Sequence, residues 1–432
     1  MEAIAAWQGR RTSWRERRLR DWIQTLPTAE PVRALGFLAQ SVRALNAAVL
    51  DPVTRAALLD LYEEPALNLA AALERPGASG AAFGLITTIH SERAQGLQMA
   101  LTPDLPPDIR PLVVAGSVRA LGEVLRVAYR TYVPAPPGLW RRLHGLMASV
   151  PEPSWGLERD YVRVVLLGLS DPYALPVGGV DAVRAIIGEV GDRAVLNTGG
   201  VGFAIHPDRD RVAEPVGEKA PLSLDTSAVL AELARLREDV RIGARLPPRL
   251  AARILPDLAV RLLATLGEAW RPGPRRRSLR VRLGGERLVC QGLAALQRLR
   301  AGDASACRYV DLEGPLLATD PPLGVGGPRP RVTIWTIRDA GRSGLWLSCQ
   351  GLDGPPPAPG SWIGVKDPES EGSWRAATVR WLKRARPREY AMGVEVLGEA
   401  QTESLLRIDP RRAAFMASPV TVPVPYAARS AR

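Results

Sequence analysis

Cysteine is scarce in this 432-residue chain, and long apolar runs are missing from it. The three cysteines, Cys290, Cys307 and Cys349, lie far apart without CxxC spacing, which disfavours both a disulfide framework and a zinc site. No window approaches the roughly 18 uncharged apolar residues that a membrane span needs. The first residues also lack the apolar core of a signal peptide. These absences predict a soluble, cytoplasmic protein without a membrane span.

The usual catalytic templates are missing as well. There is no GxxxxGK[ST] phosphate loop and no GxSxG nucleophile elbow, and the GxG pairs lack the third glycine of a dinucleotide fingerprint. Of the three histidines, His90 and His144 fall within helical patterns and are interpreted as simply packed or exposed there. His206 with Asp208 and Asp210 could hold a metal, but a polar turn is the favoured interpretation. The sequence predicts no enzyme, no catalytic residue, no metal site and no cofactor.

Positive charge, in contrast, is abundant. The net charge is +12, and because the chain has three lysines, 54 of its 57 basic residues are arginines. Nine arginines lie between Arg271 and Arg300, where Glu286 is the single acidic residue. Such a positive field favours anionic partners, namely a nucleotide, nucleic acid or acidic lipid. The adjacent acids Glu63 and Glu64 are interpreted as solvated surface charge.

Residues 1–190 are dominated by helical periodicity. Apolar residues recur at three- and four-residue spacing, and proline with Asp or Ser breaks separates the segments. No fixed repeat period is present, so an irregular helical bundle or short α-solenoid is expected. The helices are expected over 15–26, 31–50, 52–73, 109–129, 139–150 and 157–169.

The remaining chain changes character twice. A small mixed segment is expected over 191–270, with short strands near 194–205 and helices over 226–240 and 248–270. An antiparallel β-barrel is expected over 271–400, because short β-branched stretches alternate apolar and polar residues between Gly/Pro turns, and a loose tail is expected over 401–432. The fold class is therefore multidomain α+β. The barrel strands are expected at 279–283, 332–337, 344–347, 362–365, 376–382 and 390–396.

An arginine motif stands at the entry of the expected barrel. Arg275, Arg276 and Arg280 follow a helix-ending Pro-Gly-Pro and lead directly into a strand, so their guanidinium groups are not expected in a core. Guanidinium forks bind phosphate oxygens and the O6/N7 edge of guanine, and they stack on purine faces. A solvated arginine-rich linker would also explain this motif taken alone.

A second motif follows the strand expected at 332–337. Here Asp339, Gly341, Ser343 and Gly344 lie at a tight glycine turn between two strands. The Asp339 carboxylate can accept hydrogen bonds from the N1–H and amino groups of guanine. A plain hairpin turn would explain these residues equally well in isolation.

The order of the two motifs within the strand pattern resembles the PilZ domain, the bacterial receptor module for cyclic di-GMP. Arg276-Arg-Ser-Leu-Arg280 matches the family's RxxxR motif, and Asp339-Ala-Gly-Arg-Ser-Gly344 matches its [D/N]xSxxG motif at the Asp and the final Gly. The resemblance covers about 275–398. It implies a PilZ-like barrel, behind a long helical region, whose ligand-binding residues are Arg275, Arg276, Arg280, Asp339, Gly341, Ser343 and Gly344.

One position departs from the family pattern. Gly341 stands where the family has its middle Ser, and losing one hydrogen bond to a charged group costs about 1.5–3 kcal/mol. Ser343 lies two residues further on and is the candidate replacement. Weakened or lost nucleotide binding is therefore left open as an alternative.

The resemblance implies a non-enzymatic cyclic di-GMP effector in bacterial signalling, whose helical region engages a protein partner. Arg276 and Arg280 are expected to close over the ligand and to re-set the angle between the barrel and the helix at 248–270. The alternative is a degenerate PilZ-like scaffold or adaptor that no longer binds nucleotide. Nucleic-acid binding through 271–300 is disfavoured because no recognition helix or aromatic platform is visible.

Overall fold

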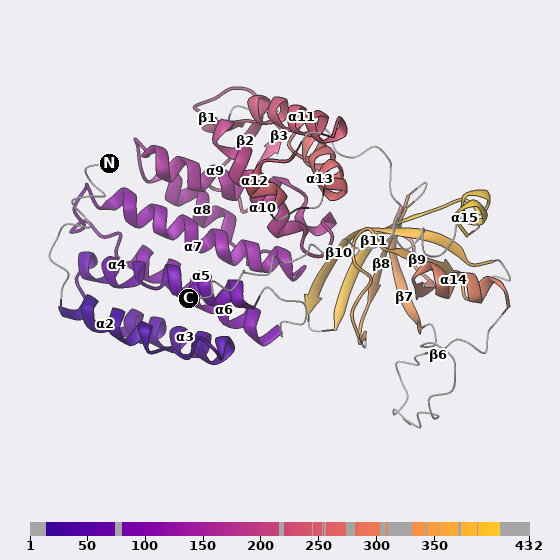
Figure 1. Ribbon diagram of the computed structural model, residues 1–432, viewed down its shortest axis with the longest axis horizontal. Coiled ribbons are helices and arrows are strands. Elements are labelled where there is room, and N and C mark those ends of the chain that lie inside the picture. The colour runs from indigo at the N-terminus through magenta and orange to yellow at the C-terminus, as the bar shows by residue number, and fades with distance from the viewer. Residues whose placement is uncertain are drawn as a thin grey trace.

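The computed structural model describes residues 14–73, 80–215, 220–243, 245–252, 254, 256–273, 281–302, 308–309, 331–341, 344–352, 354–369, 373–386 and 388–406. They form a helical N-terminal region, a small middle sheet with its own helices, and a six-stranded antiparallel β-barrel (Figure 1). The expected fold class is confirmed in each of these three parts.

The helical region is organised around one central helix. Helix α7 is buried along most of its length because α6 and α9 pack against it. The helices are α2 (Trp14–Gln24), α3 (Pro31–Ala47), α4 (Pro52–Asp60), α5 (Glu63–Ala72), α6 (Gly80–Met99), α7 (Arg110–Arg130), α8 (Leu139–Ala148), α9 (Trp155–Leu169) and α10 (Gly179–Val190). Two short 3₁₀ turns follow α9 and α10, namely η1 (Pro172–Ala174) and η2 (Gly191–Arg193).

Proline and capping side chains explain where several helices begin. Pro31, Pro52 and Pro111 stand in the first turn of α3, α4 and α7, where a missing N–H leaves no helical hydrogen bond unmade. Asp51 caps α4 by accepting a hydrogen bond from the Thr54 N–H at 2.8 Å. These signals were readable in the sequence.

The prediction of one continuous helix over 52–73 was wrong, because the helix is interrupted at Leu61 and Tyr62 and forms α4 and α5. The Tyr62 side chain is fully buried, and its hydroxyl shares a 2.6 Å hydrogen bond with Ser41 of α3. Helix α6 was not among the expected helices. Its buried face includes His90 and Arg93, so its apolar periodicity is interrupted.

The middle segment shares a hydrophobic core with the helical region. Its strands pair antiparallel in the order β1-β4-β2-β3. The Trp270 indole is fully buried and donates a hydrogen bond to the Leu166 carbonyl of α9, at 2.9 Å. The elements are β1 (Val195–Asn197), β2 (Phe203–Ile205), β3 (Glu214–Pro215), β4 (Leu222–Asp225), α11 (Ser227–Arg241), α12 (Pro248–Ala251) and α13 (Pro256–Ala269). The single helix expected over 248–270 is thus two, and Pro256 opens the second.

Six strands close the C-terminal barrel in the order β5-β9-β10-β11-β8-β7, with β7 pairing back onto β5. Strand β6 (Arg308–Tyr309) adds a short parallel pairing at the start of β7. Helices α14 (Leu293–Arg300) and α15 (Glu399–Leu406) bury apolar residues in a second small cluster with β10 and the Trp374 side chain. The barrel strands are β5 (Glu286–Gln291), β7 (Arg331–Ala340), β8 (Gly344–Cys349), β9 (Trp362–Lys366), β10 (Arg375–Arg386) and β11 (Glu389–Val396).

Two expectations for the ends of the barrel were wrong. In the strand expected at 279–283, residues 279–280 lie outside the described residues, Val281 makes an isolated bridge to Ala340, and residues 282–283 are not strand. Among the described residues the first barrel strand is β5. Residues 401–406, the first part of the expected tail, instead belong to helix α15, and the rest of that tail lies outside the described residues. The Thr402 hydroxyl of α15 accepts a hydrogen bond from the Ala376 N–H of β10 at 3.2 Å.

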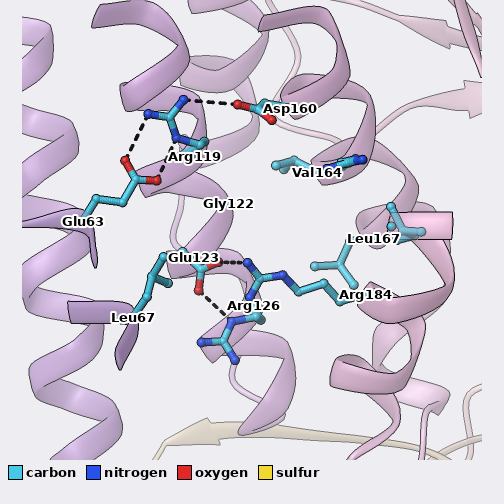
Figure 2. Close-up of a pocket in the computed structure, with 13 residues that line it drawn as sticks. Glu63, Leu67, Arg119, Gly122, Glu123, Arg126, Asp160, Val164, Leu167 and Arg184 are labelled. Carbon is cyan, nitrogen blue, oxygen red and sulfur yellow. Dashed lines mark hydrogen bonds and ion pairs between the residues drawn. The ribbon is translucent and has the colours of Figure 1, made fainter. Parts of the chain in front are cut away.

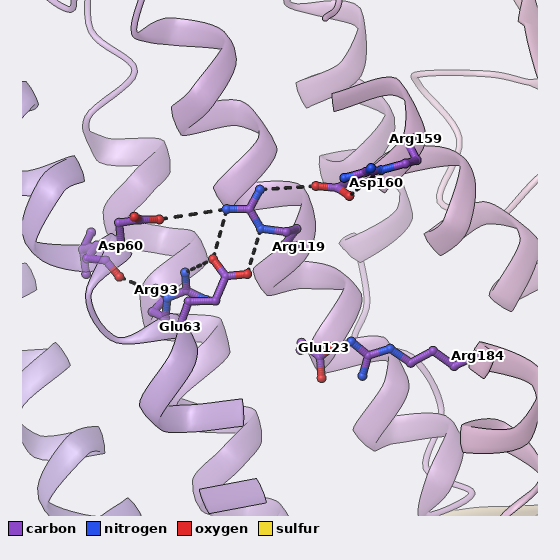
Figure 3. A network of polar contacts seen from close by, with 9 residues as sticks. Asp60, Glu63, Arg93, Arg119, Glu123, Arg159, Asp160 and Arg184 are labelled. Carbon is purple, nitrogen blue, oxygen red and sulfur yellow. Dashed lines mark hydrogen bonds and ion pairs between the residues drawn. The ribbon is translucent and has the colours of Figure 1, made fainter. Parts of the chain in front are cut away.

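A partly buried charge network ties the helical region together (Figure 3). Glu63 of α5 accepts hydrogen bonds from Arg93 of α6 at 2.9 Å and from two nitrogens of Arg119 of α7 at 2.7 and 3.0 Å. Arg119 also donates to Asp160 of α9 at 3.2 Å. The Arg93 side chain is 1% exposed. Glu63 is therefore not the solvated surface charge expected from the sequence, but the joint between four helices.

The environment of Glu63 strongly favours its ionised form. Burial alone would raise its pKa, but the hydrogen bonds from Arg119 and the charge of Arg93 outweigh burial and lower the pKa to about 2. A lowered pKa stabilises the folded state above the unfolded value of about 4.5, and that stabilisation is lost as the pH falls towards 2.

We predict that Glu63→Gln lowers the free energy of unfolding at pH 7 by about 2–4 kcal/mol, because Arg93 keeps its buried charge without its anionic partner. The stability of the wild-type protein should fall between pH 4.5 and pH 2 more steeply than that of the variant. Chemical denaturation across this pH range measures both effects.

The matched control is Glu30→Gln, which removes the exposed ion pair with Arg33. Exposed pairs contribute about 0–1 kcal/mol, so this variant should remain close to wild type. Equal stabilities of the two variants at pH 7 would contradict the role assigned to Glu63.

Candidate ligand-binding site

The predicted site residues concentrate where β7 turns into β8. The Gly341 N–H donates a hydrogen bond to the Gly344 carbonyl at 2.8 Å, so the turn brings Asp339, Gly341 and Gly344 together. Adding a Cβ at Gly344 would place it 3.2 Å from the Val394 carbonyl of β11, which explains a small residue there. The other predicted site residues lie outside the described residues, namely Arg275, Arg276, Arg280 and Ser343.

A β-bulge determines the direction of the Asp339 side chain. Ile337 pairs with Leu347, but the next pair along the strands is Asp339 with Trp346, so Arg338 is an extra residue on β7. Ile337 and Leu347 are buried in the barrel core, whereas Arg338 is exposed. Bulges re-aim side chains in this way. Arg338 and Asp339 therefore both project from the outer face of the barrel.

Asp339 begins a row of four residues that crosses four neighbouring strands. Asp339 of β7 pairs with Trp346 of β8, Trp346 pairs with Gly393 of β11, and Gly393 pairs with Trp381 of β10. Residues directly opposite each other on antiparallel strands lie on the same face. A second bulge, at Arg380, brings Trp381 to the outer face. We call Asp339, Trp346, Gly393 and Trp381 the transverse row.

The two indoles of the transverse row form one aromatic surface. Their ring centroids are 6.2 Å apart and their planes meet at 62°, and Trp346 is 38% exposed. The Trp381 indole lies over Gly393, where an added Cβ would come within 2.0 Å of its Nε1. The glycine is therefore required for the position of Trp381. This aromatic surface was not predicted from the sequence, because the bulges that create it leave no local sequence signal.

Cationic groups flank the transverse row. Arg338 donates from Nε to the Ser348 hydroxyl at 2.7 Å and is exposed. Lys383 is exposed two residues beyond Trp381 on the same face of β10, with its Nζ 6.0 Å from the Trp381 ring centroid. A carboxylate, an exposed indole and nearby cations suit a ligand with a flat, hydrogen-bonding base and anionic phosphates.

The helical region holds a cleft of about 320 Å³ between α5, α7, α9 and α10 (Figure 2). Its charged side chains bind one another both within α7 and between α7 and α10. Glu123 accepts hydrogen bonds or ion pairs from Arg126 at 2.7 Å and from Arg184 at 2.8 Å. Burial alone would raise the Glu123 pKa, but these two arginines lower it. The charges of this cleft are thus used to join helices, which makes the cleft the weaker candidate for a ligand.

The segment His206–Asp210, which was considered as a metal site, lies beside α8, and its Asp210 has a structural role there. Asp210 accepts hydrogen bonds from the backbone N–H groups of Gly138 and Trp140, at the start of α8. His144 shares hydrogen bonds with the Tyr161 hydroxyl at 2.6 Å and the Arg211 carbonyl at 2.7 Å, and burial lowers its pKa. Throughout the described part of the chain, no three His, Cys, Asp or Glu side chains are grouped as metal ligands.

The fold and the site define a protein in which a helical N-terminal region precedes a small antiparallel barrel with a candidate nucleotide-binding face. Residues 17–199 match the family model for the N-terminal domain of the cyclic-di-GMP receptor FimW. The match covers 183 of the 432 residues and ends just beyond β1. Among the curated proteins no match to this chain is found. Within the described residues, every helix is too short or too polar to cross a membrane.

The packing of Trp381 on Gly393 can be tested by substitution. Gly393→Ala should displace the indole, lower the free energy of unfolding by about 1–3 kcal/mol, and change the near-ultraviolet circular dichroism, because the new methyl group overlaps the ring. Gly284→Ala is the matched control, since a Cβ at this position, just before β5, meets nothing within 4 Å. Equal stability and unchanged dichroism in both variants would contradict the described position of Trp381.

Proposed function

We propose that this protein is a non-enzymatic receptor for cyclic di-GMP, and that its barrel is a PilZ-like domain which binds the ligand along the transverse row. The observation that carries the proposal is the outward carboxylate of Asp339 paired directly with the exposed indole of Trp346. The similarity of residues 17–199 to the N-terminal domain of a cyclic-di-GMP receptor supports it independently, because that match lies outside the barrel.

Each part of the row offers a contact that a guanine base requires. A carboxylate accepts two parallel hydrogen bonds from the N1–H and amino group of guanine, a pairing that adenine cannot form. An indole face stacks on the base, which contributes about 1–3 kcal/mol. Arg338 and Lys383 supply positive charge for the phosphates, and Arg275, Arg276 and Arg280 complete the proposed set from outside the described residues.

Stacking on the exposed indole can offset the affinity that is lost because Gly341 has no hydroxyl. Losing a hydrogen bond to a charged group costs about 1.5–3 kcal/mol. Stacking on Trp346 contributes about as much for each base. The two effects are of equal size, so we infer that binding survives the departure from the family pattern, with Ser343 available as a further donor.

The chemistry of the row favours binding over catalysis. Its described side chains are a carboxylate, two indoles and flanking cations, and Cys349 of β8 points into the core, where burial raises its thiol pKa to about 11. The protein is therefore proposed to act on a partner through its helical region rather than on its ligand. Exposed tryptophans there, Trp14 and Trp155, each lie beneath an arginine and offer contact surface to a protein.

The second candidate function is a scaffold or adaptor that binds no nucleotide. The observation that favours it is Gly341 at the position of the family Ser. A single stoichiometric protein partner, captured from the native source and unaffected by added cyclic di-GMP, would select this alternative.

We expect isothermal titration of the full chain with cyclic di-GMP to show binding below about 100 µM. Asp339→Asn should weaken it at least tenfold, because the amide replaces one acceptor with a donor that faces the guanine donors. Arg276→Ala combined with Arg280→Ala should weaken it as strongly, because two phosphate contacts are removed.

Two controls make this titration specific. Arg271→Ala combined with Arg298→Ala removes the same charge from the same region without touching the motif, and should bind like wild type. Cyclic di-AMP should bind at least tenfold more weakly than cyclic di-GMP, and Asp339→Asn should reduce that preference. An absence of binding at 100 µM, or unchanged binding in the double arginine variant, would rule out the receptor function.

A further inference from the structure

Lys383 lies between the transverse row and the helical region. Its ammonium Nζ is 4.6 Å from the ring centroid of Tyr173, in η1, and 6.0 Å from that of Trp381. Trp381 and Lys383 share the outer face of β10, since Leu382 between them is buried in the barrel core. In Figure 1, β10 is the barrel strand labelled nearest the helices. One cation therefore contacts both the candidate ligand face and the other part of the protein.

Near Lys383, strand β10 contacts the segment that follows α7 through both backbone and side-chain interactions. The Arg384 N–H donates a hydrogen bond to the Tyr132 carbonyl at 2.7 Å, just after the end of α7. Tyr132 has a φ of +58°, a left-handed conformation that a tyrosine adopts only when its surroundings fix it. Its ring packs against the barrel core, and its hydroxyl donates to the Leu175 carbonyl at 2.9 Å.

Tyr173 is fixed within the helical region. Its hydroxyl donates to the Val133 carbonyl at 3.2 Å and accepts from the Ala135 N–H at 3.1 Å, and its ring meets Tyr129 of α7 edge to face at 5.5 Å. The ring that faces Lys383 is thus part of the structure that follows α7. A movement of Lys383 away from Tyr173 removes one of the contacts between β10 and this segment.

We propose that Lys383 transmits ligand occupancy from the barrel to the helical region, an inference that rests on the function proposed above. Phosphates bound along the transverse row attract the ammonium more strongly than the half-buried Tyr173 ring does, because a full negative charge outweighs a ring quadrupole at a similar distance. The ligand draws Lys383 off Tyr173 and loosens the contact at Arg384 and Tyr132. The element that senses the ligand is then the end of α7 with η1, whereas the sequence suggested the helix at 248–270.

Thermodynamic linkage relates the effect of the ligand on the Lys383–Tyr173 contact to the effect of that contact on ligand affinity. The factor by which the ligand loosens the contact equals the factor by which loss of the contact tightens ligand binding. An exposed cation–π contact limits this factor to about two- to fivefold. Tyr173→Leu should therefore bind cyclic di-GMP two- to fivefold more tightly than wild type. Lys383→Met should bind it several-fold more weakly, because the cation that the phosphates attract is missing.

The test is amide hydrogen exchange at Arg384 in the full chain, with and without saturating cyclic di-GMP. The ligand should accelerate exchange about two- to fivefold in the wild type and leave it unchanged in Lys383→Met. Lys383→Arg, which keeps the charge, should restore the response. Arg386→Met removes a charge from the same strand, where the exposed side chain lies beyond the Tyr173 contact, and should respond like wild type.

The outcomes separate the two proposals. Binding of cyclic di-GMP to the wild type without any change in Arg384 exchange would overturn the transmission through Lys383 alone. The same acceleration in Lys383→Met as in wild type would also overturn it. An absence of ligand binding to the wild type would overturn it together with the receptor function. Because Lys383 is exposed, thermal unfolding should show that its variants remain folded.

Discussion

The two β-bulges of the barrel, at Arg338 and Arg380, are the constraint on which the rest of the candidate site depends. In a regular strand successive side chains alternate between the core and solvent. Each bulge adds one residue, so Arg338 and Asp339 both face outward on β7, and Arg380 and Trp381 both face outward on β10. Closure of the barrel then brings the re-aimed residues into one row with Trp346. Without either bulge the row would lose its carboxylate or its second indole.

Polar interactions serve different purposes in the two ends of the molecule. In the helical region, partly buried charges bind one another across helices, as at Glu63, whose carboxylate accepts hydrogen bonds from three guanidinium nitrogens. Removing water makes such pairs costly to break and leaves them little freedom to respond to a ligand. On the barrel, Arg338 and Lys383 keep their charges at the surface, where they are free to meet an anion. This contrast favours the barrel face over the helical cleft as the proposed site of ligand recognition.

Much of the architecture was predictable, and the misses have identifiable causes. Strand alternation located five of the six barrel strands, and proline or capping signals located the starts of several helices. The break between α4 and α5 was missed because the position of Tyr62 is set by its hydrogen bond to Ser41 in another helix. Helix α15 was missed because Thr402 and Leu405 become buried only through contact with the barrel. At the site, the turn at Asp339 was found from its motif, whereas Trp346 and Trp381 were not.

The sequence by itself determined what depends on near neighbours along the chain: the helical region, the antiparallel strands, the turn of Asp339 and Gly344, and the excess of arginine. These follow from residue spacing and from the conformational limits of glycine and proline. Only the tertiary structure decided which distant residues meet. Glu63 and Arg119 are 56 positions apart, and the transverse row joins four strands. Those pairings depend on strand register and helix packing, which are set by closure of the whole barrel and core rather than by any local segment.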